Sequence, residues 1–291
     1  MGNLGRPLGD GFFIRDGYQV ENTWYNPGYW HTAEDWYRMN NAETAGANVY
    51  AVADGTVVYA DANYPGRVVI VQHAGGLFSM YGHLNFNLLV QNGQQVVRGQ
   101  QIGTVLKRPD NVPSHLHFEI RTFVTTGAVN GANPRYAFRC GPNCPPGPGY
   151  WPMRAPDLPS DLGWRNPTHV INGRMFPQTA APPLGDVVVA TQPVSPSVAL
   201  WSAPPGDPSA QVLAQLTLQP GTQFPLLGVT VGPEDSRRTS AAGYQLWYRI
   251  SLPDGRDGWI QAAVPSSFDT GSDGRPSTIS FNFLPAITAA P

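Results

Sequence analysis

Short β-prone segments separated by turn residues run through residues 49–122, and this spacing constrains the fold more than any other feature of the chain. A pair of glycines at 75–76 separates two apolar segments, residues 67–73 and 77–84, as in a β-hairpin. An Asp-Gly pair at 54–55 is a second hairpin signal. Short strands at this spacing predict an all-β, mainly antiparallel fold rather than βαβ units.

The last of these segments, residues 114–121, carries two histidines two positions apart. Alternate side chains of a strand share a face, so one face would present His115, His117 and Glu119. The residues between them are apolar and would pack into a core, which leaves the imidazoles facing a cleft. An H-x-H strand can therefore offer one ring to a metal ion and the other to a substrate.

Length and composition narrow the class of protein. A chain of 291 residues suggests two domains, and 32 glycines, 30 prolines and 13% charged residues are typical of a turn-rich β protein. The formal net charge of −2, without a basic stripe, argues against nucleic-acid binding. No apolar run approaches the ~18 residues that span a membrane. Residues 1–15 lack a secretion-signal pattern, so we expect either that export does not use this route or that a signal has been removed.

Changes in composition divide the chain into parts. Residues 138–166 are rich in Pro, Gly and Trp, and we expect them to wrap the first domain, residues 1–171. A Pro-containing linker, residues 172–185, would lead to a second β-rich domain, residues 186–268. A Ser-, Gly- and Pro-rich tail, residues 269–291, would follow it.

The two cysteines, Cys140 and Cys144, flank Gly-Pro-Asn, a sequence that can turn the chain tightly. We expect a short disulfide, as in exported proteins, with two free thiols as the alternative. Zinc binding by this pair is disfavoured, because the chain has no further cysteine to complete a four-ligand set.

Four of the six histidines lie in suggestive contexts. His31 and Asp35 form an H-x-x-x-D pair, which flanking Asn, Pro and Gly residues place on a loop. His83 lies in a Y-G-H-L element, and His115 and His117 form the H-x-H pair. Each signal is weak alone, because a single histidine is more often a hydrogen-bonded structural residue.

In this order the motifs resemble those of the lysostaphin-type (LytM-like) zinc endopeptidases of bacterial cell-wall metabolism. The resemblance covers residues 25–125, and the stretches at residues 52–57 and 96–103 look like the core strands of that family. It implies a β-sheet peptidase domain with a zinc cleft.

The resemblance implies a role for each of five residues. His31, Asp35 and His117 would bind Zn²⁺, and two imidazoles with one carboxylate leave a fourth position for water, as in catalytic zinc sites. His83 and His115 would orient or deprotonate that water and stabilise the oxyanion. The chain has no H-E-x-x-H motif, so a histidine has to act as the general base.

Further residues near these motifs carry expectations of their own. Glu119 is expected at the edge of the cleft, although it could instead steady an imidazole. The family usually has Gly where this chain has Ala33, and the Glu34 that follows could add charge near the metal. We expect His73 to be exposed in a hairpin and His169 to be structural.

The second β-rich region, residues 186–264, resembles a bacterial SH3-like domain. The resemblance rests on residues 199–204, 246–250 and 254–260. It implies a C-terminal β-barrel that binds wall peptides or glycan. A barrel with a purely structural role is the alternative.

These features predict a zinc metalloendopeptidase that hydrolyses stem-peptide or cross-bridge bonds in bacterial peptidoglycan. We expect a monomer that meets peptidoglycan peptides in an extracellular, periplasmic or cell-surface setting. The alternative is a non-catalytic cell-wall-binding protein or an activator of another hydrolase. Lipoyl and biotinyl carriers, a third class, share strand motifs with this chain, but its single lysine, Lys107, lies outside the predicted hairpin tip.

Overall fold

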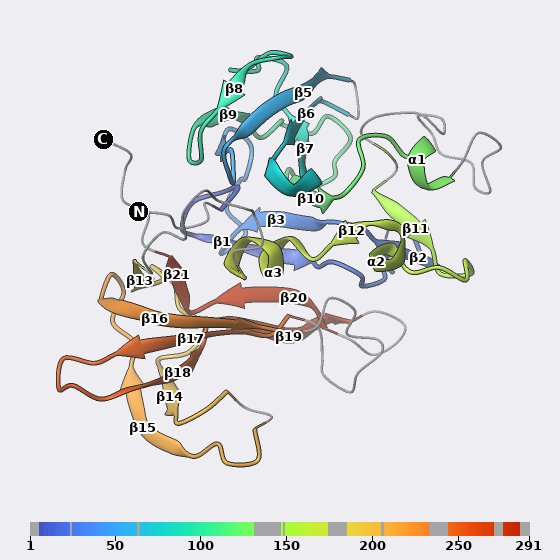
Figure 1. Ribbon diagram of the computed structural model, residues 1–291. Helices are drawn as coiled ribbons and strands as arrows, with labels where there is room; N and C mark the ends of the chain where they lie inside the picture. The colour runs from blue at the N-terminus through green and yellow to red at the C-terminus, as the bar shows by residue number, and fades with distance from the viewer. Residues whose placement is uncertain are drawn as a thin grey trace.

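The computed structural model describes most of the chain (Figure 1). The described residues are 6–23, 25–62, 65–130, 147, 149–173, 185–204, 207–232, 244–270 and 276–285. Within them the fold is mainly antiparallel β, which confirms the predicted fold class. Cys140 and Cys144, with the expected disulfide, lie outside the described residues, as do residues 174–184 of the expected linker.

A large antiparallel sheet forms the centre of the fold. Its strands follow the order β19-β20-β1-β3-β10-β7-β6-β5-β8, and β12 pairs with β10. In chain order these strands are β1 (Phe12–Asp16), β3 (Glu34–Arg38), β5 (Gly55–Asp61), β6 (Arg67–Gln72), β7 (Phe78–Leu84), β8 (Gln95–Val96), β10 (Leu116–Arg121), β12 (Trp164–Arg165), β19 (Ala263–Thr270) and β20 (Pro276–Phe281). Two further strand pairs are β2 (Tyr29–His31) with β11 (Tyr150–Pro152), and β4 (Asn48–Tyr50) with β9 (Gln101–Thr104).

The C-terminal part adds a seven-stranded sheet with the order β15-β14-β18-β17-β16-β13-β21. Its strands are β13 (Asp186–Val189), β14 (Ser197–Trp201), β15 (Val212–Thr217), β16 (Gln223–Val231), β17 (Leu246–Ser251), β18 (Asp257–Gln261) and β21 (Phe283–Pro285). The helical elements are short: α1 (Gly127–Asn130), α2 (Pro159–Leu162), α3 (Pro167–Asn172) and a 3₁₀ turn, Ala74–Gly76. Among the helices of the described residues, none has the length and apolar character that crossing a membrane requires.

The structure forms one of the two predicted hairpins. β6 and β7 pair around the glycine pair, where Gly75 and Gly76 both have φ of 74°, a conformation that favours glycine. The hairpin predicted at Asp54 and Gly55 is wrong, because β4 pairs with β9 while β5 pairs with β6 and β8. Glycine serves a close backbone approach here, since a Cβ on Gly55 would lie 2.3 Å from the Gln72 carbonyl oxygen.

Strands from the two ends of the chain lie side by side in the large sheet (Figure 1). β20 pairs with β1 at Ile14 and Ile279, and β19 pairs with β20. The Gly17 amide also donates a hydrogen bond of 2.9 Å to the Ser277 carbonyl. Residues 276–285 of the expected tail are therefore almost entirely strand, because apolar side chains such as Ile279 are fully buried there.

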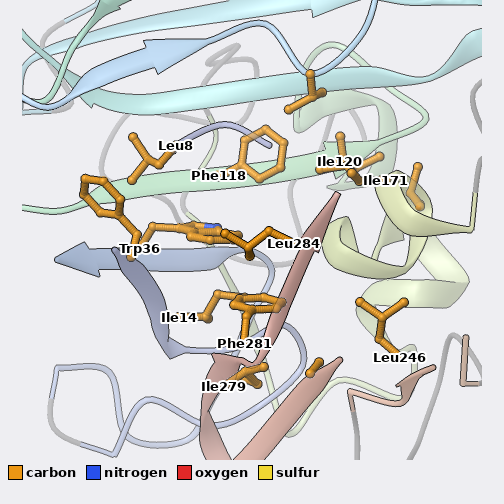
Figure 2. Close-up of a cluster of buried hydrophobic side chains, with 14 of the residues drawn as sticks. Leu8, Ile14, Trp36, Phe118, Ile120, Ile171, Leu246, Ile279, Phe281 and Leu284 are labelled. Carbon is orange, nitrogen blue, oxygen red and sulfur yellow. The ribbon is translucent and has the colours of Figure 1, made fainter. Parts of the chain in front are cut away.

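The main core is shared by the large sheet and the C-terminal strands (Figure 2). Trp36 of β3 stacks on Phe281 of β20, with ring centroids 5.7 Å apart. The Arg6 guanidinium lies 4.7 Å from the Trp36 ring centre and 4.5 Å from that of Phe281. Phe118 of β10 is fully buried in the same cluster. Because this face of β3 and β10 is fixed in the core, their other face is left for polar side chains.

Two buried histidines lie apart from the H-x-H strand. The expectation that His73 is exposed is wrong, because its ring nitrogens contact the Asp54 carbonyl (2.8 Å) and the Ser79 hydroxyl (2.7 Å), and the side chain is buried. His169 lies in α3, buried against the Tyr244 ring, whose centroid is 5.8 Å away. Burial lowers the pKa of both histidines to about 4, so both are neutral at pH 7.

We predict that His169 makes the fold less stable as the pH falls. Burial lowers its pKa from 6.5 to about 4, so the unfolded chain takes up the proton first and stability is lost between these pH values. At pH 5 the loss amounts to about 2 kcal/mol. Urea unfolding of chelator-treated protein at neutral pH and at pH 5 should show a smaller loss for His169→Leu than for the wild type. Equal losses would contradict the prediction.

Candidate metal centre

The pairing of β3 with β10 brings candidate metal ligands together. His117 lies directly opposite Asp35 in this antiparallel pair, and His31 is the last residue of β2. Asp35 Oδ1 is 3.1 Å from His117 Nδ1 and 3.5 Å from His31 Nε2, and these two ring nitrogens are 3.4 Å apart. The loop expected for His31 and Asp35 is wrong, because each lies on a strand that is held by a paired neighbour.

Hydrogen bonds determine which nitrogen of each ring faces the cluster. His31 Nδ1 is 3.2 Å from the Asp16 carbonyl oxygen and 3.3 Å from that of Gly17, so it donates there and Nε2 faces inward. His117 Nε2 is 3.1 Å from Glu119 Oε1 and donates to it, which directs Nδ1 into the cluster. Each ring thus has one nitrogen held outside the cluster as a donor and the other directed into the cluster.

Glu119 holds the His117 ring on the side away from the cluster. Its Oε2 accepts hydrogen bonds from Arg121 Nη1 (3.0 Å) and Trp164 Nε1 (3.0 Å). Burial alone would raise the pKa of Glu119, but the Arg121 charge and hydrogen bonds from His117 and Trp164 lower it. The expected place at the cleft edge is therefore wrong: Glu119 is fully buried and steadies the His117 ring, the alternative that the sequence left open.

The electrostatics of the cluster suit a divalent cation. Burial alone would raise the pKa of Asp35, but the charges of His31 and His115 and a hydrogen bond from His117 hold it well below its usual range. Burial alone would lower the pKa of His117, but hydrogen bonds to Asp35 and Glu119 raise it to about 9. The carboxylates of Asp35 and Glu119 therefore favour positive charge within the cluster. Two imidazole nitrogens and one carboxylate match the donor set of catalytic zinc sites, so the residues fit zinc.

His83 and His115 lie next to this cluster. The two rings meet edge to face with centroids 4.7 Å apart, and His115 Nε2 is 3.8 Å from Asp35 Oδ2. His83 Nδ1 contacts the Pro65 carbonyl (3.0 Å) and His115 Nδ1 contacts the Pro113 carbonyl (2.8 Å). Both Nδ1 atoms can donate to these carbonyls, so Nε2 is the acceptor nitrogen of each ring.

A β-bulge sets the direction of the His83 side chain. The register of β7 against β6 shifts around this residue, so β7 contains one more residue than its partner there. His83 has φ of +58°, in the left-handed region that non-glycine residues rarely adopt. Bulges and strained backbone of this kind re-aim side chains and gather at functional sites.

Arg108 is a neighbour of the site that the sequence analysis missed. Its Nη1 lies 3.2 Å from His83 Nε2, while Nη2 donates to Asp110 Oδ2 (2.7 Å). Burial lowers the pKa of His83 well below its usual range, and the charges of His115, His117 and Arg108 lower it further. These neighbours favour the neutral ring, whose Nε2 atom faces the Arg108 guanidinium. No motif marks Arg108, because its place depends on how the loop before β10 folds over β7.

Glu34 does not add charge to the cluster, contrary to expectation. Adjacent residues of a strand point to opposite faces, so Glu34 points away from the ligand face of Asp35. Its carboxylate accepts hydrogen bonds from the Thr168 amide (2.9 Å) and the Trp36 indole (3.1 Å), and it is hydrogen-bonded to Tyr244. Burial raises the pKa of Glu34 to about 7, against the effect of these hydrogen bonds.

Aromatic rings pack on two of the histidines. Tyr37 of β3 stacks on His115, with ring centroids 5.0 Å apart. Tyr150 of β11 lies over His31 at a centroid distance of 5.1 Å. Tyr150 was not singled out from the sequence, because only the pairing of β11 with β2 brings it to the site.

Part of this chain is similar in sequence to known proteins. It is 41% identical over 88 residues to the murein hydrolase activator EnvC of Escherichia coli, an alignment that covers 30% of this chain and 20% of EnvC. It is 38% identical over 76 residues to the peptidoglycan DD-endopeptidase ShyA of Vibrio cholerae, covering 26% of this chain and 17% of ShyA. The chain therefore spans about a fifth of the length of these relatives. A zinc-containing peptidase from Vibrio cholerae aligns with 28% identity and a TM-score of 0.33, over 40% of this chain and 36% of that one.

The family match falls on the same part of the molecule. Residues 35–131 match Peptidase family M23. This range includes Asp35, His83, His115 and His117, and His31 lies just before it. Residues 35–131 are therefore a domain of Peptidase family M23.

Proposed function

We propose that the protein is a zinc-dependent endopeptidase that hydrolyses peptide bonds in bacterial peptidoglycan. One observation carries the proposal: the ligand atoms of His31, Asp35 and His117 all lie within 4.8 Å of one another. Two more histidines, His83 and His115, lie beside them, and Nε2 is the acceptor nitrogen of each ring. The relative ShyA is a peptidoglycan endopeptidase by name, which supports the substrate class.

The proposed mechanism divides the work between the metal ligands and two neighbouring imidazoles. His31, Asp35 and His117 would hold Zn²⁺, which would polarise the scissile carbonyl and lower the pKa of a water molecule. Burial lowers the pKa of both His83 and His115, which favours the neutral form of each ring. One of these rings takes the proton of the attacking water at Nε2. The imidazolium then donates a hydrogen bond to the oxyanion and passes its proton to the leaving amine.

A non-catalytic role as an activator of another hydrolase is the second candidate. The relative EnvC carries that function in its name and supports this alternative. A protein that acts only as an activator has no need for a full set of metal-binding and proton-accepting groups. The set is present here, with Glu119 holding the His117 ring in place, and this favours catalysis.

We also propose that the C-terminal sheet is an SH3-like module that binds cell-wall peptides or glycan. An open groove on this sheet is lined by Pro204, Thr230 and Trp247, among others. The groove places the apolar Pro204 and Val231 beside the polar Asp207 and Gln245, a mixed lining that suits peptide or sugar ligands. The protein would then act outside the cytoplasm, where peptidoglycan lies.

Digestion of purified peptidoglycan tests the endopeptidase. Zinc-loaded protein should release cleaved peptides that mass spectrometry detects, because the metal is needed to polarise the carbonyl. Chelator-treated protein should release none, and the fragment masses should identify the bond. Absence of cleavage by protein that carries bound zinc would contradict the proposal and favour the activator.

Two alanine variants should separate metal binding from proton transfer. His117→Ala removes a ligand and should lose both zinc and activity. His115→Ala leaves the three ligands in place, so it should keep zinc and lose about 10²-fold or more in kcat. The measurements are the zinc content of desalted protein by mass spectrometry and the rate of peptide release. Loss of zinc from His115→Ala would show that this division of roles is wrong.

A further inference from the structure

The residue before Asp35 belongs to a buried network that reaches into the C-terminal part of the chain. The Glu34 side chain is fully buried and accepts hydrogen bonds from the Thr168 amide (2.9 Å) and the Trp36 indole (3.1 Å). It is also hydrogen-bonded to the Tyr244 hydroxyl. These partners come from β3, from α3 and from the segment that leads into β17. A carboxylate next to a candidate metal ligand is thus held by three separate segments.

The same Tyr244 hydroxyl supports the segment that orients His31. It accepts a hydrogen bond of 2.6 Å from the Tyr18 amide. Tyr18 directly follows Asp16 and Gly17, whose carbonyl oxygens lie 3.2 Å and 3.3 Å from His31 Nδ1. One phenolic oxygen therefore connects the supports of two of the three candidate ligands.

Because these groups are buried, water cannot replace a hydrogen bond that is lost. Tyr244 and Tyr18 are buried, and the Glu34 side chain has no exposed surface. In such a setting the removal of one polar group leaves its partners without a replacement. Loss of the Tyr244 hydroxyl would therefore loosen β3 one residue from Asp35 and, at the same time, the turn behind His31.

We propose that Tyr244 is a positioning residue for the metal centre, and that the C-terminal part of the chain holds the candidate ligands in place rather than serving only to recognise the cell wall. The inference rests on the metal role proposed above for the three-residue cluster. The pairing of β20 with β1 reinforces the same connection, because the Gly17 amide donates to the Ser277 carbonyl (2.9 Å). Outer residues that orient metal ligands typically change metal affinity by about 10–100-fold.

The test compares Tyr244→Phe with a matched control, Tyr248→Phe. Tyr248 is also buried, and its hydroxyl donates to Asn172 Oδ1 (2.6 Å). Each variant thus removes one buried hydroxyl from the same region, and only the first removes the link to Glu34 and Tyr18. Zinc affinity of the full chain is measured by competition with a chromophoric chelator, well below the melting temperature. We expect Tyr244→Phe to weaken zinc binding about 10-fold or more, and Tyr248→Phe to bind zinc like the wild type.

A second variant tests the route of the effect. Glu34→Gln alters the other end of the same hydrogen bond, so the losses in zinc affinity from Glu34→Gln and Tyr244→Phe should not add in the double variant. Melting of the chelator-treated proteins, recorded in parallel, reports the loss of stability without metal. Additive losses in zinc affinity would show that Tyr244 does not act through Glu34.

The outcomes separate this inference from the proposed function. If Tyr244→Phe binds zinc as tightly as the wild type, the positioning role is wrong and the metal centre stands. If both tyrosine variants weaken zinc binding equally, the positioning role is also wrong, because general destabilisation explains the loss. If the wild type binds no zinc, the proposed metal centre itself is refuted, and the inference with it.

Discussion

The antiparallel pairing of β3 with β10 is the interaction on which the site depends. It sets Asp35 opposite His117 on one face and buries Trp36 and Phe118 on the other. A shift in register by one residue would exchange these faces, bringing the aromatic rings to the site and the polar groups into the core. Packing of Trp36 and Phe118 therefore selects the register in which the candidate metal ligands meet.

Charge in this buried site is balanced by the strand that carries it. Glu119 and Arg121 lie two positions apart on β10, share one face and form a buried ion pair. The ion pair keeps the Glu119 carboxylate ionised. The His117 ring therefore lies between two carboxylates, with Glu119 at Nε2 and Asp35 at Nδ1. Burying two carboxylates is costly unless cations and donors surround them, and the histidines, Arg121 and the Trp164 indole provide these partners.

The sequence predicted those features of the site that depend on residues close together in the chain. The H-x-H strand was predictable because its alternation specifies both the strand and the face of each ring. The meeting of His31 and Asp35 with that strand followed only from resemblance, since an H-x-x-x-D spacing does not say which strand lies beside it. The contacts of Arg108 and Tyr244 could not be predicted, because they depend on loops and strands that pack from distant parts of the chain. The hairpin predicted at Gly55 was wrong for a related reason. A glycine is needed there because the backbone lies close to β6, not because the chain turns.

The joining of β1 to β20 has a consequence for the order of folding. The Thr278 hydroxyl and the Arg15 carbonyl that it contacts are 263 residues apart in the chain. Contacts between such distant residues carry a large entropy cost and slow the folding reaction. During synthesis on the ribosome, β1 emerges early and has no partner on this edge until residues 276–281 have left the exit tunnel. The candidate metal centre would then mature late, after the C-terminal strands have joined the sheet.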